Sequence, residues 1–256
     1  MTDQDLLYKV QDGIATLTIN RESRRNSIDP KVTRLCHEYL EAAAVDEQVR
    51  VVCFTGAGDK AFCSGADLAG ELGAEGINAF QDYANLLKRI CGYPKPTVAR
   101  VNGHCLAGGT GFMLACDIVV ATDQAKFGTP EVNVGLFPMM IGALIFRNVL
   151  RKKAMEMCLL GERLTAGQAL EMGLVTRVVP PDKLDEEVNS ILKNLAAKSP
   201  IGMRIGKTAF HHMADLPFGE AVDYLAKQLM QVVVTEDAKE GITAFLEKRQ
   251  PRFTGK

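Results

Sequence analysis

Three short segments bring glycines and polar side chains together directly after predicted buried strands. They are residues 61–68 (AFCSGADL), 101–111 (VNGHCLAGGTG) and 125–131 (AKFGTPE). The second segment has the pattern of a glycine-rich helix start, where backbone amides lack partners within the helix and the helix dipole favours an anion. It therefore indicates an anion-binding turn, although the same glycines would also permit close packing of a helix against a strand.

Several other chemistries do not fit the sequence. The second segment lacks the GxGxxG spacing of a dinucleotide site, and the chain has no GxxxxGK[ST] phosphate loop. A GxSxG elbow of the serine hydrolase type is also missing. The 7 cysteines are odd in number and form no CxxC pair, which favours buried free thiols over disulfides or a zinc cluster. We expect no metal and no separate cofactor.

Composition restricts the class of protein further. The chain has 256 residues, 47% of them hydrophobic, and a net charge of -1, so it can form a large core and has no basic excess for nucleic acid or an anionic membrane. The sequence opens with acidic residues rather than an apolar signal, and no apolar run approaches the roughly 18 residues that span a bilayer. We expect a cytoplasmic protein with neither nucleic-acid nor membrane partners.

The elements that must position the three segments alternate between strands and helices. Short apolar strands at 51–55, 97–101 and 118–121 are typical of strands buried on both faces. Helices with apolar faces are predicted before and between them, the first capped by Asp29 with Pro30 in its first turn. An initial hairpin at 7–19 and a last strand at 175–179 complete the pattern, which predicts an α/β fold.

The chain beyond Pro180 and Pro181 reads as helical only. Predicted helices occupy 184–197, 201–213, 218–234 and 237–248, and the last three carry broad apolar faces with little left to cover them. We therefore divide the chain into a core at 1–197 and a helical oligomerisation region at 198–256.

Taken together, the motifs FCSGADL, NGxxxAGG and KFGxPE resemble the crotonase (enoyl-CoA hydratase/isomerase) superfamily. The resemblance extends from the first hairpin to the AFLEKR motif near the carboxyl terminus. It implies a crotonase-like spiral of β-β-α units, a C-terminal helical trimerisation region, and a homo-oligomer that is a trimer or a dimer of trimers. It also implies an acyl-CoA thioester as substrate, so that CoA is part of the substrate.

The resemblance implies a catalytic role for three residues. The backbone amides of Ala66 and Gly108 match the pair that holds the thioester oxygen, where the charge of an enolate collects. Two fixed donors aimed at that oxygen would each contribute about 3 kcal/mol. Glu131 matches a catalytic carboxylate, and an apolar setting would raise its pKa towards that of a useful acid and base.

The same resemblance implies contacts with CoA. Arg24, Arg25 and Lys248, the last reaching across from a neighbouring subunit, match positions near the CoA phosphates, and a solvated surface charge is the alternative for each. The adenine half of CoA would lie against Ser64, Asp67 and Leu68.

The sequence departs from the family pattern at Gly111. Typical hydratases carry a second glutamate there, so this chain has one catalytic carboxylate, and we expect Gly111→Glu to raise hydration of crotonyl-CoA. The stretch Met139, Met140 and Ile141 is a candidate acyl pocket, or else part of the core. We interpret His104 and Asp117 as structural.

These observations predict an enoyl-CoA hydratase/isomerase-type enzyme with Glu131 as its single acid and base. One carboxylate suffices for double-bond migration, which favours isomerisation over efficient hydration. The alternatives are another CoA-enolate reaction, such as decarboxylation or C–C bond hydrolysis, and a non-catalytic acyl-CoA-binding scaffold. Retention of Glu131 argues against the scaffold.

Overall fold

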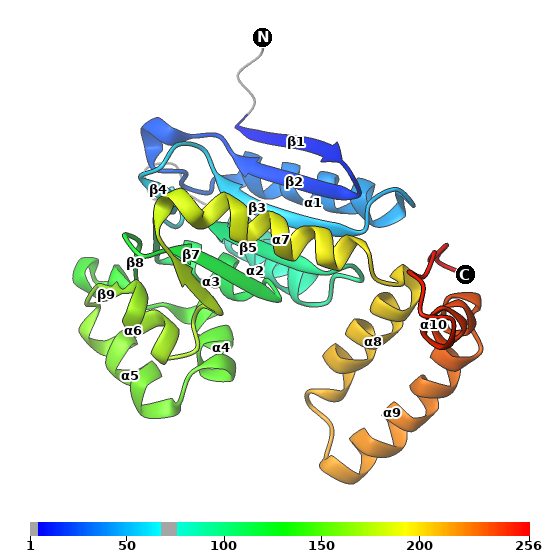
Figure 1. The fold of residues 1–256 in the computed structure, drawn as a ribbon. Coiled ribbons are helices and arrows are strands. Elements are labelled where there is room, and N and C mark those ends of the chain that lie inside the picture. Colours follow the sequence, from blue (N-terminus) through cyan, green and yellow to red (C-terminus); the bar gives the residue numbers. More distant parts are fainter. Residues whose placement is uncertain (1–4, 68–75) are drawn as a thin grey trace.

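The strands form two sheets in the structure, a computed structural model that describes residues 5–67 and 76–256 (Figure 1). The strands are β1 (Leu6–Gln11), β2 (Ile14–Ile19), β3 (Val51–Gly56), β4 (Ala61–Cys63), β5 (Thr97–Val101), β6 (His104–Leu106), β7 (Ile118–Thr122), β8 (Lys126–Gly128), β9 (Leu164–Thr165) and β10 (Arg177–Val179). The described residues form a six-stranded sheet in the order β1-β2-β3-β5-β7-β10 and a four-stranded sheet in the order β4-β6-β8-β9. β1 and β9 run antiparallel to their neighbours, and the remaining pairs are parallel.

Several helices begin where the sequence supplies a cap. Asp29 accepts a 2.8 Å hydrogen bond from the Val32 amide, and Thr165 forms a capping box with Gln168. The helices are α1 (Pro30–Val45), α2 (Gly76–Cys91), α3 (Gly108–Leu114), α4 (Met139–Asn148), α5 (Arg151–Leu160), α6 (Ala166–Glu171), α7 (Leu184–Ala196), α8 (Pro200–Met213), α9 (Phe218–Val233) and α10 (Glu236–Leu246), with 3-10 turns η1 (Glu22–Arg24), η2 (Pro130–Val134) and η3 (Pro181–Lys183).

The larger sheet is buried on both faces, as its apolar strands predict. One face packs against α7, where Val51 and Val98 meet Leu184 and Val188. The opposite face joins the main core with α1 and α2, and every residue of β3 is buried. The alternation of buried parallel strands and covering helices confirms the predicted α/β class.

The last predicted strand is shorter than expected. It was expected at 175–179, but β10 begins at Arg177. Thr176 instead uses its hydroxyl to accept from the Val119 amide at 3.0 Å and to donate to the Val119 carbonyl. The Thr176 amide also donates to the Val119 carbonyl (3.0 Å), but the Val119 amide bonds to this hydroxyl rather than to a backbone carbonyl, and regular pairing starts at Arg177.

Helices α8, α9 and α10 extend away from the sheets in Figure 1. Lys207 on α8 ties them to the core through an ion pair with Asp117 (2.5 Å) and a hydrogen bond to the Lys95 carbonyl (3.1 Å). The predicted division between residues 197 and 198 falls in the connection from α7 to α8, and the oligomerisation role of 198–256 stays a prediction. No helix in the described ranges is long and apolar enough to cross a membrane.

Candidate active site

The smaller sheet gathers the three chemical segments at one edge. β4, β6 and β8 are parallel neighbours, so their carboxyl ends meet on the same side. Ala66 follows β4 by three residues, Gly108 follows β6 by two, and Glu131 follows β8 by three. This sheet was not predicted, because strands of two or three residues show no periodic pattern. It is nevertheless the element that brings these three positions together.

The Ala66 amide is free because of how its segment pairs with Ile28. The Ile28 amide donates to the Gly65 carbonyl (2.8 Å), and the Asp67 amide donates to the Ile28 carbonyl (2.9 Å). Ala66 forms the bridge between these two bonds, so its own N–H points the other way. Ala66 is exposed.

Gly108 begins α3 behind a strained residue. Ala107 has φ 51 and ψ -131, a conformation that costs a non-glycine residue about 1–3 kcal/mol and is typical of functional sites. Gly65, at φ 100, faces it, and a side chain at Gly65 would lie 2.7 Å from the Ala107 Cβ. Glycine at 65 therefore permits both the left-handed backbone and the close approach.

The two amides lie side by side. The Ala66 nitrogen is 3.5 Å from the point where a Cβ on Gly108 would stand, and a Cβ on Gly109 would meet the Cys63 carbonyl oxygen at 2.4 Å. Within the described residues, no hydrogen bond is donated by the amide of either Ala66 or Gly108. Two unpaired donors this close together are suited to binding a single anionic oxygen.

Glu131 is a half-buried carboxylate. Its Oε2 is buried and has no hydrogen-bond partner among the described residues. Burying such an oxygen costs folding free energy, and a functional role is one reason why a protein keeps it. Burial raises the pKa of Glu131 above its ordinary value, and its own backbone amide opposes that shift weakly. A carboxylate of this kind suits general acid and base chemistry.

Tyr83 on α2 is a site residue that sequence reasoning missed. Its hydroxyl donates a 2.5 Å hydrogen bond to the Gly108 carbonyl. Burial raises the pKa of Tyr83 well above 10, with nearby thiols and Glu131 adding to the effect. Nothing in the sequence around Tyr83 distinguishes it from an ordinary residue on an amphipathic helix.

The space beside Gly111 is filled, which corrects one expectation. A Cβ on Gly111 would lie 2.1 Å from the Ile141 Cγ2 and 2.8 Å from the Ile141 Cβ. Ile141 is 3% exposed and belongs to the main core. Gly111→Glu by itself would therefore collide with α4, and the expectation that this single change raises hydration is withdrawn.

The other two candidates for an acyl pocket are placed differently. Met139 is 74% exposed, whereas Met140 is partly buried and packs against the main core. Of the three, Ile141 is the residue that lies nearest to Gly111 of α3.

The loop after β2 carries an ion-pair network. Asp67 Oδ2 pairs with Arg21 (2.9 Å) and Arg24 (2.8 Å), and Arg21 also pairs with Asp29 (3.0 Å). These pairs hold the pKa of Asp67 below its usual range, the hydrogen bond from Arg24 being the largest cause. Asp67 therefore fixes the segment next to Ala66. Arg21 is buried, and sequence reasoning missed it, because its only signal in the sequence is its position shortly after β2.

Arg25 and Ser64, two of the predicted CoA-binding residues, border this network. Arg25 is exposed in a left-handed conformation (φ 53), and its carbonyl accepts from the Ser64 amide at 3.2 Å. Leu68 lies outside the described residues. Lys248 follows α10, which lies at the opposite end of the molecule from the loop after β2 (Figure 1), so within one chain it is not beside Arg24 and Arg25.

His104 and Asp117 have structural partners. His104 Nδ1 accepts from the Lys126 amide at 3.2 Å, between β6 and β8. Asp117 Oδ2 accepts from the Thr97 amide (2.7 Å) and pairs with Lys207, at the amino ends of β5 and β7. Asp117 therefore lies at the start of these strands rather than at a carboxyl edge.

Cysteines and metal ligands offer no second site in the described part of the chain. All 7 cysteines are free thiols, and every one except Cys91 is buried. Burial raises the pKa of Cys63 to about 12, so it stays protonated and unreactive at neutral pH. The described residues contain no group of three or more His, Cys, Asp or Glu side chains that could hold a metal ion.

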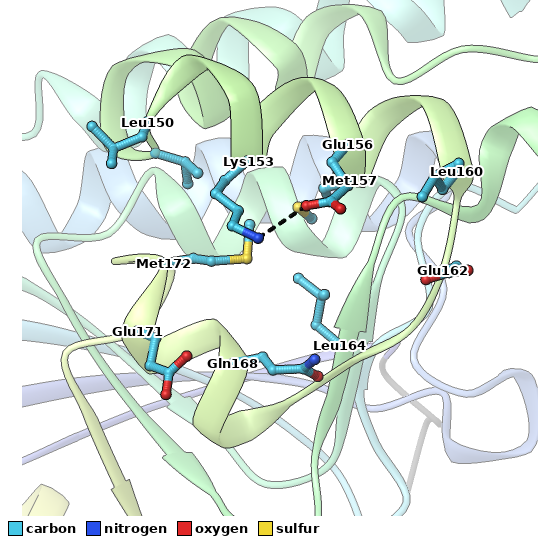
Figure 2. Close-up of a pocket in the computed structure, with 11 residues that line it drawn as sticks. Leu150, Lys153, Glu156, Met157, Leu160, Glu162, Leu164, Gln168, Glu171 and Met172 are labelled. Carbon is cyan, nitrogen blue, oxygen red and sulfur yellow. Dashed lines mark hydrogen bonds and ion pairs between the residues drawn. The ribbon is translucent and has the colours of Figure 1, made fainter.

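A pocket of about 410 Å³ lies between α5 and α6 (Figure 2). Glu156, Glu162 and Glu171 line it, and the ion pair of Lys153 with Glu156 (3.1 Å) leaves its charge negative. Such a pocket would repel CoA phosphates, and neither Ala66, Gly108 nor Glu131 lines it. Its wall supports the active-site segment instead, because the Met157 carbonyl accepts from the Thr129 hydroxyl at 3.1 Å.

Known proteins match this chain over its whole length. The sequence profile described as enoyl-CoA hydratase/isomerase matches residues 9–256. A Thermus thermophilus protein with the provisional name enoyl-CoA hydratase is 37% identical over 96% of this chain and all of its own. The 2,3-dehydroadipyl-CoA hydratase of Escherichia coli is 33% identical over 98% of this chain and 99% of its own.

A solved structure has the same fold. The enoyl-CoA hydratase of Bacillus anthracis superposes with a TM-score of 0.94 at 31% identity, covering 99% of this chain and all of its own. The match confirms the crotonase fold, with two sheets followed by C-terminal helices.

Proposed function

The chain belongs to the enoyl-CoA hydratase/isomerase family, and we propose that it moves the double bond of an enoyl-CoA thioester through an enolate held by Ala66 and Gly108. One observation carries the proposal: two unpaired amides lie side by side at the sheet edge from which Glu131 presents a buried, unpartnered carboxylate oxygen. The two amides can stabilise the negative charge of an enolate oxygen, and the carboxylate can exchange a proton with carbon.

The reaction needs only these groups. Glu131 takes a proton from carbon 2 of a 3-enoyl thioester, and the electron pair of that C–H bond passes into a dienolate whose charge collects on the thioester oxygen. The amides of Ala66 and Gly108 donate to that oxygen. Glu131 then returns the proton to carbon 4 on the same face, which gives the 2-enoyl thioester and restores the carboxylate.

Ile141 supports migration over hydration. Hydration needs a base for the attacking water and an acid for the α carbon, and two carboxylates divide that work well. The space beside Gly111, one helical turn beyond Gly108, holds the Ile141 side chain. A hydrocarbon there can neither orient nor deprotonate water.

Hydration is the second candidate, because all three relatives described above are named as hydratases, one of them provisionally. Comparing kcat/KM for 3-hexenoyl-CoA and crotonyl-CoA separates the two. The proposal predicts that isomerisation of the first exceeds hydration of the second by tenfold or more, an order-of-magnitude estimate from one missing catalytic group. Faster hydration would select the second candidate, and no reaction with either substrate would contradict both.

The binding and assembly proposals concern the rest of the molecule. We propose that Arg24 and Arg25 bind CoA phosphates, that Ser64 and Asp67 border the adenine half, and that Lys248 reaches CoA from a second subunit of a trimer or a dimer of trimers. The exposed apolar residues of α8 to α10 support assembly. The cytoplasm remains the predicted compartment.

A further inference from the structure

The hydroxyl of Tyr83 contacts the oxyanion-hole residue Gly108 from outside its own helix. It donates to the Gly108 carbonyl at 2.5 Å, and its oxygen stands 3.6 Å from the point where a Cβ on Gly108 would be. Tyr83 comes from α2, whereas Gly108 begins α3. The bond therefore links α2 to the start of α3, and the strand pairing of the smaller sheet makes no such link.

Gly108 has few side-chain restraints. It has no side chain, and Ala107 before it is strained and provides no side-chain cap for α3. Other bonds at this turn go from the Ala107 amide (2.9 Å) and the Thr110 hydroxyl (3.1 Å) to the Gly128 carbonyl, and from the Thr110 amide to the Ala107 carbonyl (2.9 Å). These bonds hold the residues on either side of Gly108. Among the described residues, the bond from Tyr83 is the one side-chain hydrogen bond to Gly108 itself.

We propose that Tyr83 is a positioning residue. By holding the Gly108 carbonyl, which belongs to the peptide unit after Gly108, it limits rotation about the Gly108 backbone bonds. Together with the bond from the Thr110 amide to the Ala107 carbonyl, it keeps the Gly108 N–H directed towards the thioester oxygen. The inference rests on the proposed function, since it assigns Tyr83 to the same oxyanion hole. A small rotation about the Gly108 backbone would turn the amide away from the oxygen. An error of about 1 Å in such a site can cost on the order of a hundredfold in rate.

The hydroxyl is suited to this task throughout the working pH range. Burial keeps the pKa of Tyr83 well above 10, so the proton remains available for donation. The bond is also partly buried, where hydrogen bonds are stronger than in water.

Tyr93 provides a matched control. It is fully buried, and its hydroxyl donates to the Leu40 carbonyl at 2.8 Å, which is likewise a bond from a tyrosine to a helix carbonyl. Neither Tyr93 nor Leu40 belongs to the segments that follow β4, β6 and β8. Tyr93→Phe therefore removes a comparable bond whose role is stability alone.

The test is the infrared stretch of the thioester carbonyl in bound butyryl-CoA labelled with carbon-13 at that carbon. In the native protein the band should move to lower frequency than in free ligand, because two amides polarise the carbonyl. Tyr83→Phe should lose a large part of this displacement and lower kcat roughly tenfold to a hundredfold, with KM changed less than about twofold. Tyr93→Phe should keep the full displacement.

The outcomes separate the two proposals. A native band that does not move would contradict the oxyanion hole and thus the proposed function. A native displacement that Tyr83→Phe retains in full would overturn the role of Tyr83 and leave the proposed function standing. If Tyr83→Phe fails to fold, 3-fluorotyrosine placed at position 83 keeps the ring and donates more strongly, so it should displace the band further, and an unchanged band would overturn the inference.

Discussion

Glu131 combines a raised pKa with a buried oxygen that has no partner in the described residues. Glu131→Gln keeps the size of the side chain and removes its ability to exchange a proton, so kcat should fall by about a hundredfold to ten-thousandfold. The native kcat/KM should rise with pH through the raised pKa, above the ordinary value of 4.5, because the base must be ionised. Steady-state assays from pH 4 to 9 check both statements, and full activity of the variant would refute the role.

The same carboxylate should weaken the fold at neutral pH. Burial raises the folded-state pKa, so between the ordinary and the raised value the folded state binds more protons than the unfolded state, and stability falls as pH rises. Glu131→Gln should therefore have a higher Tm than the native protein at pH 7, and the difference should shrink below pH 4.5. Exposed Glu47 provides the control, because Glu47→Gln should show no such trend.

One N–H donor of the proposed oxyanion hole can be removed at Ala66 without breaking a hydrogen bond of the fold. The pairing with Ile28 uses the Gly65 carbonyl and the Asp67 amide, so proline at 66 removes an N–H that the fold does not use. Ala66→Pro should lower kcat on the order of a hundredfold to a thousandfold while binding of CoA thioesters is largely kept. Calorimetric titration with butyryl-CoA measures binding, and an unchanged rate in a folded variant would mean that the hole lies elsewhere.

At the scale of elements, the contact between α3 and α4 determines how many carboxylates the site can hold. Gly111→Glu alone should fold poorly, because its Cβ would meet Ile141 at 2.1 Å. Gly111→Glu combined with Ile141→Gly removes the obstruction, at a cost of about 2–5 kcal/mol for the lost core side chain and about 1 kcal/mol for glycine in a helix. The double variant should hydrate crotonyl-CoA faster than Ile141→Gly alone, and equal rates would show that a carboxylate at 111 does not reach the substrate.

The sequence predicted the elements well where a pattern was long enough. The Asp29 cap and the strands of the larger sheet lie where apolar periodicity and cap chemistry put them. The smaller sheet could not be predicted, because its strands are too short for a pattern. The contacts of Tyr83 and Ile141 with α3 depend on how helices pack in three dimensions, which a linear motif does not contain.

At the scale of the whole molecule, α8, α9 and α10 present large apolar side chains to solvent. Phe218 is 85% exposed, Phe245 82% and Leu246 73%. A soluble monomer rarely exposes so much apolar surface on neighbouring helices, so we expect a trimer or a dimer of trimers. Sedimentation velocity at micromolar concentration should show it, and Phe245→Glu should shift the distribution towards monomer. A native monomer would contradict the prediction.

The central claim is that Glu131 and two backbone amides generate and hold an enolate of a CoA thioester. Exchange of the α protons of hexanoyl-CoA in D2O, followed by mass spectrometry, tests it most directly, because exchange requires the enolate whichever product the enzyme forms. The native protein should exchange an α proton, Ala66→Pro should do so on the order of a hundredfold more slowly, and Glu131→Gln should not exchange it. No exchange by the native protein, or exchange by Glu131→Gln at the native rate, would contradict the account.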